Sequence, residues 1–386
     1  AAGAGVRVYP VVKADAYGHG AVPVARAIEA AVDGLSVATF DEAVELRDGG
    51  VAAPILVLYP VPAEVVADAA RLGIALSVGD EVLLGRLLAA TPRSVGSSSP
   101  PLRVHVEVET GLGRGGFLPE RLPGVVATVR AAPGVSLDGI WSHLQAPGDP
   151  TRTSRQGERF DASVETIESE GLTRHLVATG GLVTGAEPAY DAVRPGLATY
   201  GIVPDDMGTV AGALVPRLRP VMALRARPVR VADLPAGWGI SYGPTFETSR
   251  PSRIATLPLG YGDGWSRMLS NRAEALVRGT RVSLVGNVAM DAVMADVTDV
   301  PGPPVGVDDE FTLIGTQGGD EISVQDVARV RSTISWEVVT TMSRRLPRVY
   351  HAAAGPVGIR TLNGSEEPWR GSTSGTAHPA PRSARS

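Results

Sequence analysis

The chain has 386 residues, 44% of them hydrophobic and 20% charged, with a formal net charge of -5. This length and composition suit two soluble globular domains, or one barrel with an appended domain, and the absence of a basic stripe makes nucleic acid and anionic membranes poor candidate partners. Cysteine is absent, which excludes disulfides, thiolate nucleophiles and cysteine-bound metals.

The first half of the chain alternates short apolar strands with amphipathic helices. Eight strands are predicted, over residues 6–12, 35–38, 55–58, 74–78, 102–108, 137–142, 175–178 and 192–194. The helices predicted between them cover residues 21–31, 41–47, 63–71, 81–90 and 155–170. Eight strands that alternate with helices favour an α/β fold with an N-terminal (β/α)8 TIM-type barrel. An open doubly wound sheet is the alternative, but no G-x-G-x-x-G motif follows the first strand.

After about residue 216 the chain becomes β-rich. The strands predicted there cover residues 221–231, 252–258, 275–277, 281–285, 290–297 and 310–314, and a helix near residues 335–345 closes this part. We therefore predict a barrel over residues 1–215, a β-rich C-terminal domain over 216–363 and a disordered tail over 364–386. An exposed loop is expected over residues 91–101.

The start of the chain and its hydropathy give two further expectations. No strong helical pattern follows the eighth strand and the chain begins at Ala1 without methionine, so we expect a covering helix in a missing N-terminal piece. No apolar run approaches the roughly 20 residues that span a bilayer, so we expect a cytoplasmic enzyme. The six histidines are scattered without ligand spacing, which disfavours a metal enzyme.

Polar residues recur where the predicted barrel strands end, and in a (β/α)8 barrel the chemistry gathers at those ends. Lys13 ends the first strand in the stretch V-V-K-A-D-A-Y-G-H-G. The other polar residues at these ends are Tyr17, Glu107, Glu109, Arg114, His143, Thr179 and Arg194, and Gly196 comes two residues after Arg194. Each of them has an ordinary structural explanation alone, but their convergence on one rim is hard to attribute to chance.

These residues match the requirements of an aldehyde cofactor. A lysine in a pocket can form a Schiff base if its amine stays partly neutral. Thr179 and the Gly196 backbone can present donors to a phosphate, and Arg194 can face a ring nitrogen. A lysine, a phosphate cradle and a ring-facing arginine together indicate pyridoxal 5'-phosphate.

The ordered motifs of the chain resemble those of the alanine racemase family, which has fold type III. They are V-V-K-A-D-A-Y-G-H-G, T-G-L-G-R, W-S-H, V-R-P-G, I-S-Y-G-P-T-F, L-P-L-G-Y-G-D-G-W and G-N-V-A-M-D, between about Val11 and Arg348. Each motif is modestly specific and the ordered series is highly specific. The resemblance implies a homodimeric isomerase that interconverts L- and D-alanine. The D-alanine would be a peptidoglycan precursor. A racemase for serine or another small amino acid is the alternative.

The same resemblance implies catalytic roles. Lys13 would carry the cofactor and act as one proton-transfer base, and Tyr242 from the partner subunit would act as the opposite base. Racemisation needs an acid or base on each face of a planar carbanion, so one lysine does not suffice. His143 and Arg194 match residues that hydrogen-bond towards that tyrosine, and Arg194 would also face the pyridine nitrogen.

Binding roles follow from the resemblance as well. Arg114 matches the residue that contacts the cofactor's phenolic oxygen and the substrate carboxylate. Tyr261 and Met290 match residues that the partner subunit lends to the entrance and the substrate pocket. The residues that match the phosphate contacts are Tyr17, Thr179, Gly196 and Leu197.

Some positions depart from the family pattern. Glu107 stands where the family often has a carbamylated lysine that positions Arg114, and it supplies a carboxylate without modification. Ala289 replaces a common cysteine, and Thr179 replaces a serine but keeps the hydroxyl. Trp336 stands where a tyrosine commonly reaches the phosphate, which leaves the exact amino acid substrate open.

Two rival functions share this barrel and cofactor. A decarboxylase of basic amino acids typically borrows a cysteine from its partner as proton donor, and this chain has none. A non-catalytic protein that carries pyridoxal phosphate is built on the barrel alone, whereas a β-rich domain with Tyr242 is expected here.

Overall fold

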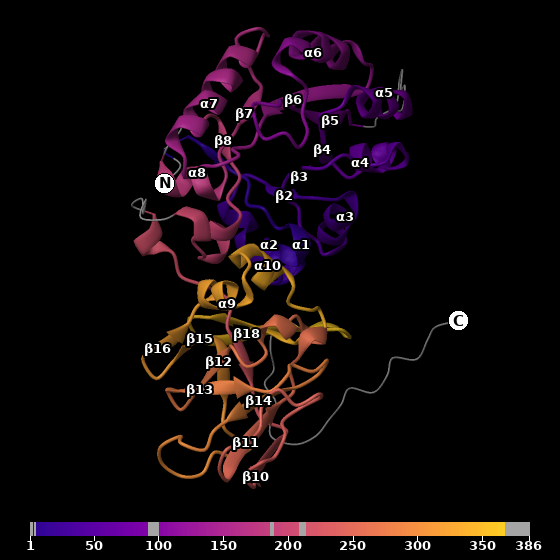
Figure 1. Ribbon diagram of the computed structural model, residues 1–386. Coiled ribbons are helices and arrows are strands. Elements are labelled where there is room, and N and C mark those ends of the chain that lie inside the picture. The colour runs from indigo at the N-terminus through magenta and orange to yellow at the C-terminus, as the bar shows by residue number, and fades with distance from the viewer. Residues whose placement is uncertain (1–2, 4, 92–99, 186–188, 208–213, 367–386) are drawn as a thin grey trace, which may run out of the picture. The chain divides into compact units, whose positions relative to one another are not determined.

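The computed structural model describes residues 1–386 except 1–2, 4, 92–99, 186–188, 208–213 and 367–386 (Figure 1). Most of the predicted exposed loop over residues 91–101 lies outside the described residues. Residues 1–342 form one compact unit and residues 343–386 belong to a second. Within the described residues, no helix is both long and apolar enough to cross a membrane.

The first part of the chain is the predicted (β/α)8 barrel. Strands β2 to β7 pair in parallel in chain order, and β1 pairs in parallel with β8. The isolated bridges Val11–Ser36 and Ala178–Arg194 join the two groups, so the circle of strands closes. The strands are β1 (Arg7–Val8), β2 (Leu35–Val37), β3 (Ile55–Val57), β4 (Ile74–Val78), β5 (Leu102–Glu107), β6 (Val135–Trp141), β7 (Thr173–His175) and β8 (Ala192–Val193).

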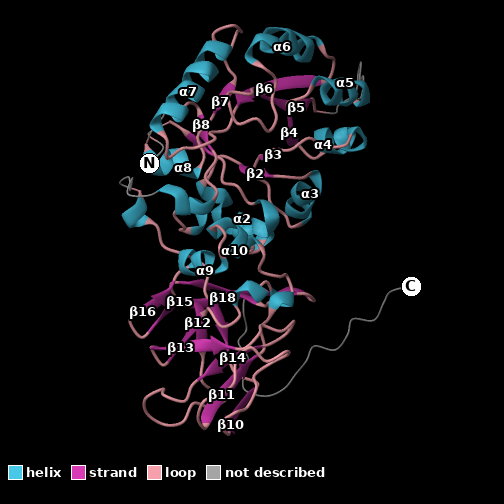
Figure 2. Cartoon of the chain, in the orientation of Figure 1, coloured by secondary structure: helices cyan, strands magenta, loops and turns pink. Residues whose placement is uncertain are grey.

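Helices surround the strands on the outside, as Figure 2 shows. Capping side chains fix several of their starts: Thr39 forms a capping box with Glu42, and Asp80 accepts from the Leu83 N–H at 2.9 Å. The helices are α1 (Lys13–Tyr17), α2 (Ala21–Ile28), α3 (Phe40–Asp48), α4 (Val66–Arg71), α5 (Glu81–Ala90), α6 (Leu122–Ala131), α7 (Pro150–Val164) and α8 (Thr179–Thr184).

Helix α6 was not predicted from the sequence. Its first turn contains Pro123 and Gly124, which read as a break. Proline is tolerated in the first turn because the amides there have no partner within the helix. The helix is then held by the buried side chains of Leu122, Val125 and Val129. Similarly, α7 begins at Pro150, five residues before the predicted start, and Asp149 caps it.

The second part of the first unit is an antiparallel sheet with the strand order β10-β11-β14-β13-β12-β15-β16 and with β9 paired to β15. The predicted strand over residues 221–231 is two strands, because Pro228 lacks an N–H and the chain changes partner from β15 to β11 there. The elements are β9 (Leu224–Ala226), β10 (Arg230–Leu234), β11 (Ser252–Leu257), β12 (Glu274–Val277), β13 (Thr280–Val285), β14 (Val293–Asp296), β15 (Phe311–Gln317), β16 (Asp320–Ile322), α9 (Val324–Arg331) and α10 (Ser335–Thr340).

The second unit contains a three-stranded antiparallel sheet of β17 (Arg348–Ala352), β18 (Gly355–Thr361) and β19 (Gly364–Glu366). Strand β19 pairs with β18, so the prediction of a disordered tail from residue 364 was wrong for its first three residues. The remaining residues of that tail, 367–386, lie outside the described residues. The predicted boundary between barrel and β-rich domain near residue 216 stays a prediction.

Candidate active site

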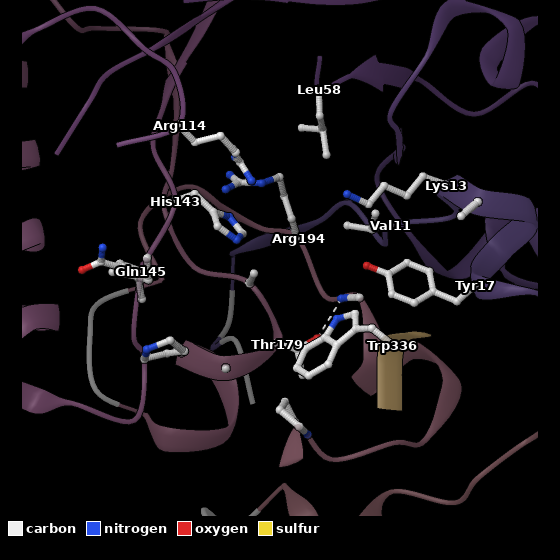
Figure 3. A pocket seen from close by; sticks show the side chains of 18 of the residues that line it. Val11, Lys13, Tyr17, Leu58, Arg114, His143, Gln145, Thr179, Arg194 and Trp336 are labelled. Atoms are coloured by element: carbon white, nitrogen blue, oxygen red, sulfur yellow. Dashed lines mark hydrogen bonds between the residues drawn. The ribbon is translucent and has the colours of Figure 1, made fainter. Parts of the chain in front are cut away.

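A pocket of about 450 Å³ opens where the barrel strands end. Its side chains come from the segments after β1, β3, β5, β6, β7 and β8 and from α10, and Figure 3 shows them converging on one space. The predicted site residues that line it are Lys13, Tyr17, Arg114, His143, Thr179, Arg194 and Gly196. Trp336 of α10 also lines it. The structure therefore brings together seven of the nine residues that the sequence placed at the strand ends, whereas Glu107 and Glu109 do not line the pocket.

A left-handed helical turn presents Lys13 and Tyr17 to the pocket. The four residues Ala14 to Tyr17 have φ between +51° and +56°. This conformation costs roughly 1–2 kcal/mol for each residue with a Cβ, so contacts elsewhere must offset the strain. The Ala14 N–H donates to Glu42 at 2.6 Å, and the Ala21 N–H donates to Asp15 at 2.9 Å. Carboxylates on both sides therefore fix the turn.

Gly18 ends this turn and lies against helix α10. Its φ is +78°, and a Cβ built on it would lie 2.0 Å from the carbonyl oxygen of Val339. Gly73 has a similar φ of +63° but open space around the Cβ position. We expect Gly18→Ala to destabilise the fold by roughly 3 kcal/mol or more and Gly73→Ala by about 1 kcal/mol. Urea unfolding midpoints of the two variants measure this, and equal shifts would contradict the close approach.

The amine of Lys13 lies among other cations. Burial lowers the pKa of Lys13, the charge of Arg114 lowers it further, and only Glu42 opposes them. The ring of Tyr59 lies near both cations, with Nζ of Lys13 at 5.7 Å and Cζ of Arg114 at 5.5 Å from its centroid. A lysine with a lowered pKa is the kind that reacts with carbonyl groups or moves protons near neutral pH.

Arg194 is a buried cation, 2% exposed, that is held by neutral acceptors. It donates to Nδ1 and to the carbonyl of His175 and, at 2.7 Å, to the carbonyl of Ser142. Its Cζ lies 4.8 Å from the ring centroid of Trp141. Burial lowers the pKa of Arg194 to about 9, against the charge of Glu107, so the guanidinium stays protonated at neutral pH.

Arg114 is positioned by the loop that follows β5. Its Nη2 lies 3.6 Å from Oε1 of Glu107, and burial raises the pKa of Glu107 although Arg114 opposes this. Glu109 does not line the pocket, and its carboxylate accepts from the N–H groups of Gly111 and Gly113. Glu107 therefore contacts Arg114, and Glu109 stabilises the loop that carries Arg114.

The opposite end of the pocket is a cradle of hydroxyl groups and backbone. Oγ1 of Thr179 accepts from the Gly196 N–H at 2.8 Å, as the dashed line in Figure 3 shows. A Cβ on Gly196 would lie 2.6 Å from the Tyr17 hydroxyl, so only glycine leaves that hydroxyl its space. Burial raises the pKa of Tyr17 to about 12, which keeps its phenol protonated as a donor. Leu197 is fully buried behind this cradle.

The ring of His143 lies beside the side chains of Arg114 and Arg194 in the view of Figure 3. Burial lowers its pKa to about 3, and the charges of Arg194, Arg114 and Lys13 act in the same direction. The imidazole is therefore neutral at neutral pH, and it can donate one hydrogen bond and accept another.

Comparison with known proteins decides the family of the chain. The family described as "Alanine racemase, N-terminal domain" matches residues 1–204, and "Alanine racemase, C-terminal domain" matches residues 221–350. The chain belongs to the alanine racemase family. The alanine racemase of Symbiobacterium thermophilum is 42% identical over 89% of this chain and 90% of its own, and that of Sorangium cellulosum is 40% identical over 89% and 91%.

Solved structures of alanine racemases share the fold of the chain. The enzyme from Bacillus anthracis, solved with bound L-Ala-P, has a TM-score of 0.85 at 32% identity and covers 94% of this chain and 92% of its own. The enzyme from E. faecalis has a TM-score of 0.82 at 34% identity, covering 89% and 91%. The predicted family and the two-part fold are thereby confirmed.

The three site residues expected from the β-rich domain do not line the pocket of their own chain. Tyr242, Tyr261 and Met290 are exposed, at 78%, 43% and 54%. Asn287 holds the turn of Tyr242 by donating to the carbonyls of Tyr242 at 2.9 Å and of Gly243 at 3.0 Å. The Tyr261 N–H donates to the Ala289 carbonyl at 3.0 Å. Hydrogen bonds therefore join the segments that carry Tyr242, Tyr261 and Met290 in this member of the alanine racemase family, and these segments form one connected surface.

Sequence reasoning missed two residues at or near the pocket. Tyr59, which both cations approach, follows β3 in a segment without a recognisable motif. His175 was assigned only as the start of a strand, although its buried ring accepts from Arg194. A histidine directly before the apolar run L-V-A, as in T-R-H-L-V-A, was the available signal.

Proposed function

We propose that this chain is a pyridoxal 5'-phosphate-dependent racemase that interconverts L- and D-alanine as a cytoplasmic homodimer. The observation that carries the proposal is the single pocket that combines the Lys13 amine, the cations Arg114 and Arg194, and the Thr179–Gly196 cradle. Membership of the alanine racemase family supports the same reaction. A lysine, a phosphate cradle and a ring-facing cation together suit this cofactor better than any other common one.

The residues present fit the cofactor. The Tyr17 phenol, the Thr179 hydroxyl and the backbone of Gly196 and Leu197 would hold its phosphate, in a place that a Cβ on Gly196 would fill. Arg194 would face the ring nitrogen, and as a cation without a lone pair it could only donate to it. Lys13 would hold the aldehyde carbon covalently. When bound, pyridoxal 5'-phosphate supplies an electron sink that makes the Cα proton of an attached amino acid acidic.

Two groups of the protein would then move the Cα proton. The Lys13 amine, whose pKa is lowered by burial and by Arg114, would take or return the proton on one face. The Tyr242 oxygen of the partner subunit would do so on the other face. A phenol is a weak base at neutral pH, so this role requires positive groups close to its oxygen, and the pocket supplies cations. Neutral His143 would link Arg194 to that phenol by hydrogen bonds.

The substrate carboxylate would bind to Arg114. Its guanidinium lies 3.6 Å from Glu107 and 5.5 Å from the centroid of the Tyr59 ring, and these two contacts would orient its donors. The same arginine would contact the phenolic oxygen of the cofactor. Glu107 would thus take the positioning role of a carboxylate without any covalent modification.

The homodimer is proposed because the second base lies on the surface of its own chain. Tyr242 is 78% exposed, and Tyr261 and Met290 project from the same connected surface. Large exposed apolar side chains gathered in one place mark an interaction surface. A twofold dimer that seats this surface on the barrel rim of its partner would complete both sites, with Tyr261 and Met290 at the entrance and substrate pocket.

A spectrum and a substrate panel test this function. We expect purified protein with added pyridoxal 5'-phosphate to acquire a visible absorbance band. It should convert L-alanine and D-alanine to the same racemic mixture, with serine and larger amino acids slower because Trp336 occupies the pocket wall. Polarimetry or chiral chromatography measures the conversion. Faster turnover of serine than alanine would refute the substrate, and no racemisation of any amino acid would refute the activity.

A further inference from the structure

A line of hydrogen bonds runs from Arg194 into the interior of the barrel. The guanidinium of Arg194 donates to Nδ1 of His175, and Nε2 of His175 lies 2.9 Å from Nδ1 of His105 on β5. Both histidine rings are buried, His105 at 5% exposure and His175 at 2%. The rings meet edge to face, with centroids 5.1 Å apart. His105 is not among the residues that line the pocket.

The protonation of the two histidines follows from the chemistry of Arg194. A guanidinium has only donors, so Nδ1 of His175 must be unprotonated to accept from Arg194. Burial lowers the pKa values of His175 and His105, the latter to about 3, so both rings are neutral at neutral pH. The proton of His175 is then on Nε2 and points at His105. Nδ1 of His105 must therefore be an acceptor.

We propose that His105 is a positioning residue for Arg194: by accepting a hydrogen bond at Nδ1, it keeps the proton of His175 on Nε2 and leaves Nδ1 of His175 as the acceptor for the guanidinium. This deepens the proposed function, because it rests on the role of Arg194 towards the cofactor ring. Without the acceptor on His105, the Nε2–H of His175 is a buried donor without a partner, or the proton moves to Nδ1 and opposes the donors of Arg194.

The remaining contacts of Arg194 explain why it depends on this acceptor. Within the described residues Arg194 forms no ion pair, and its other protein contacts are backbone carbonyls and the Trp141 face. The ring of His175 also stacks parallel to Trp141, with an interplanar angle of 3°. The Nη1 group of Arg194 shares its hydrogen bonds between the His175 carbonyl and Nδ1 of the same residue, so a proton on Nδ1 would remove one of these two acceptors and repel the guanidinium. Its direction towards the pocket changes as a result.

Two substitutions of His105, one with and one without an acceptor, separate this role from simple packing. His105→Asn keeps an acceptor oxygen close to the position of Nδ1, whereas His105→Leu has a similar volume without an acceptor. Solid-state ¹⁵N spectra of the full-length protein, labelled on histidine, report which ring nitrogens are protonated. We expect His175 to carry its proton on Nε2 in the unmodified protein and in His105→Asn. In His105→Leu we expect a mixture of tautomers.

Kinetics of the cofactor-loaded enzyme give the second readout. We expect His105→Leu to lower kcat by roughly tenfold or more with KM within about twofold, and His105→Asn to stay within about threefold of the parent. Equal behaviour of the two variants in spectra and kinetics would overturn the proposal. So would a parent spectrum with the His175 proton on Nδ1, even if neither variant folds. The spectra need no catalysis, so a failure of the proposed function would be recognised separately.

Discussion

Replacing Lys13 by alanine is expected to lower kcat/KM for alanine racemisation by roughly 10⁴-fold or more, because the amine both holds the cofactor and moves a proton. The visible absorbance band of the bound cofactor should disappear at the same time. In the unmodified protein, borohydride reduction followed by peptide mapping is expected to leave the cofactor on Lys13. Chiral chromatography and absorbance spectra measure the two effects together.

Two controls separate this loss from damage to the fold. Lys13→Arg keeps the positive charge, and we expect it to be as inactive as Lys13→Ala because a guanidinium neither forms the covalent bond nor gives up its proton. Burial lowers the pKa of Lys13, so the folded state binds its proton less tightly than the unfolded chain does. The charged amine therefore costs stability below its folded pKa, and Lys13→Ala should melt no earlier than the parent at neutral pH. An active Lys13→Arg variant would contradict the proposed role.

The strands and helices of the barrel could be predicted because short stretches of sequence define them. Strand β4 and helix α5 have the predicted bounds, since runs of apolar residues and a capping Asp80 define them within a few positions. The predicted elements were wrong where contacts with residues distant in sequence determine the structure. Pro228 divides a predicted strand because the residues before it pair with β15 and those after it pair with β11. Helix α6 forms because the barrel buries its apolar face in spite of Pro123.

Part of the site could be predicted because the C-terminal ends of all barrel strands lie on one rim. Lys13, Arg114 and Arg194 line one pocket because parallel strands carry their C-terminal ends to the same face. The left-handed turn of Ala14 to Tyr17 was not predictable, because its contact with Glu42 on α3 joins residues that are 28 positions apart. The pairing of His105 with His175 is likewise a contact between strands that are 70 residues apart.

Mixing two inactive chains tests the shared active site. Tyr242→Phe lacks the proposed second base and Lys13→Ala lacks the first, so each variant alone is expected to lose racemisation by roughly 10³-fold or more. A heterodimer of the two has one site with Lys13 from one chain and Tyr242 from the other, and a second site that lacks both. Heterodimers isolated through two different affinity tags are therefore expected to recover about half of the parent activity.

The same experiment distinguishes a shared site from a site within one chain. If Tyr242 served the pocket of its own chain, each site in the heterodimer would lack one base, and the heterodimer would remain as inactive as either variant. Co-purified pairs of Lys13→Ala with Lys13→Arg provide the control, since no arrangement of these chains restores an amine at position 13. Recovery in the first pair and not in the second would mean that the exposed turn held by Asn287 delivers its phenol across the subunit interface. Absence of recovery in both would refute the two-chain mechanism.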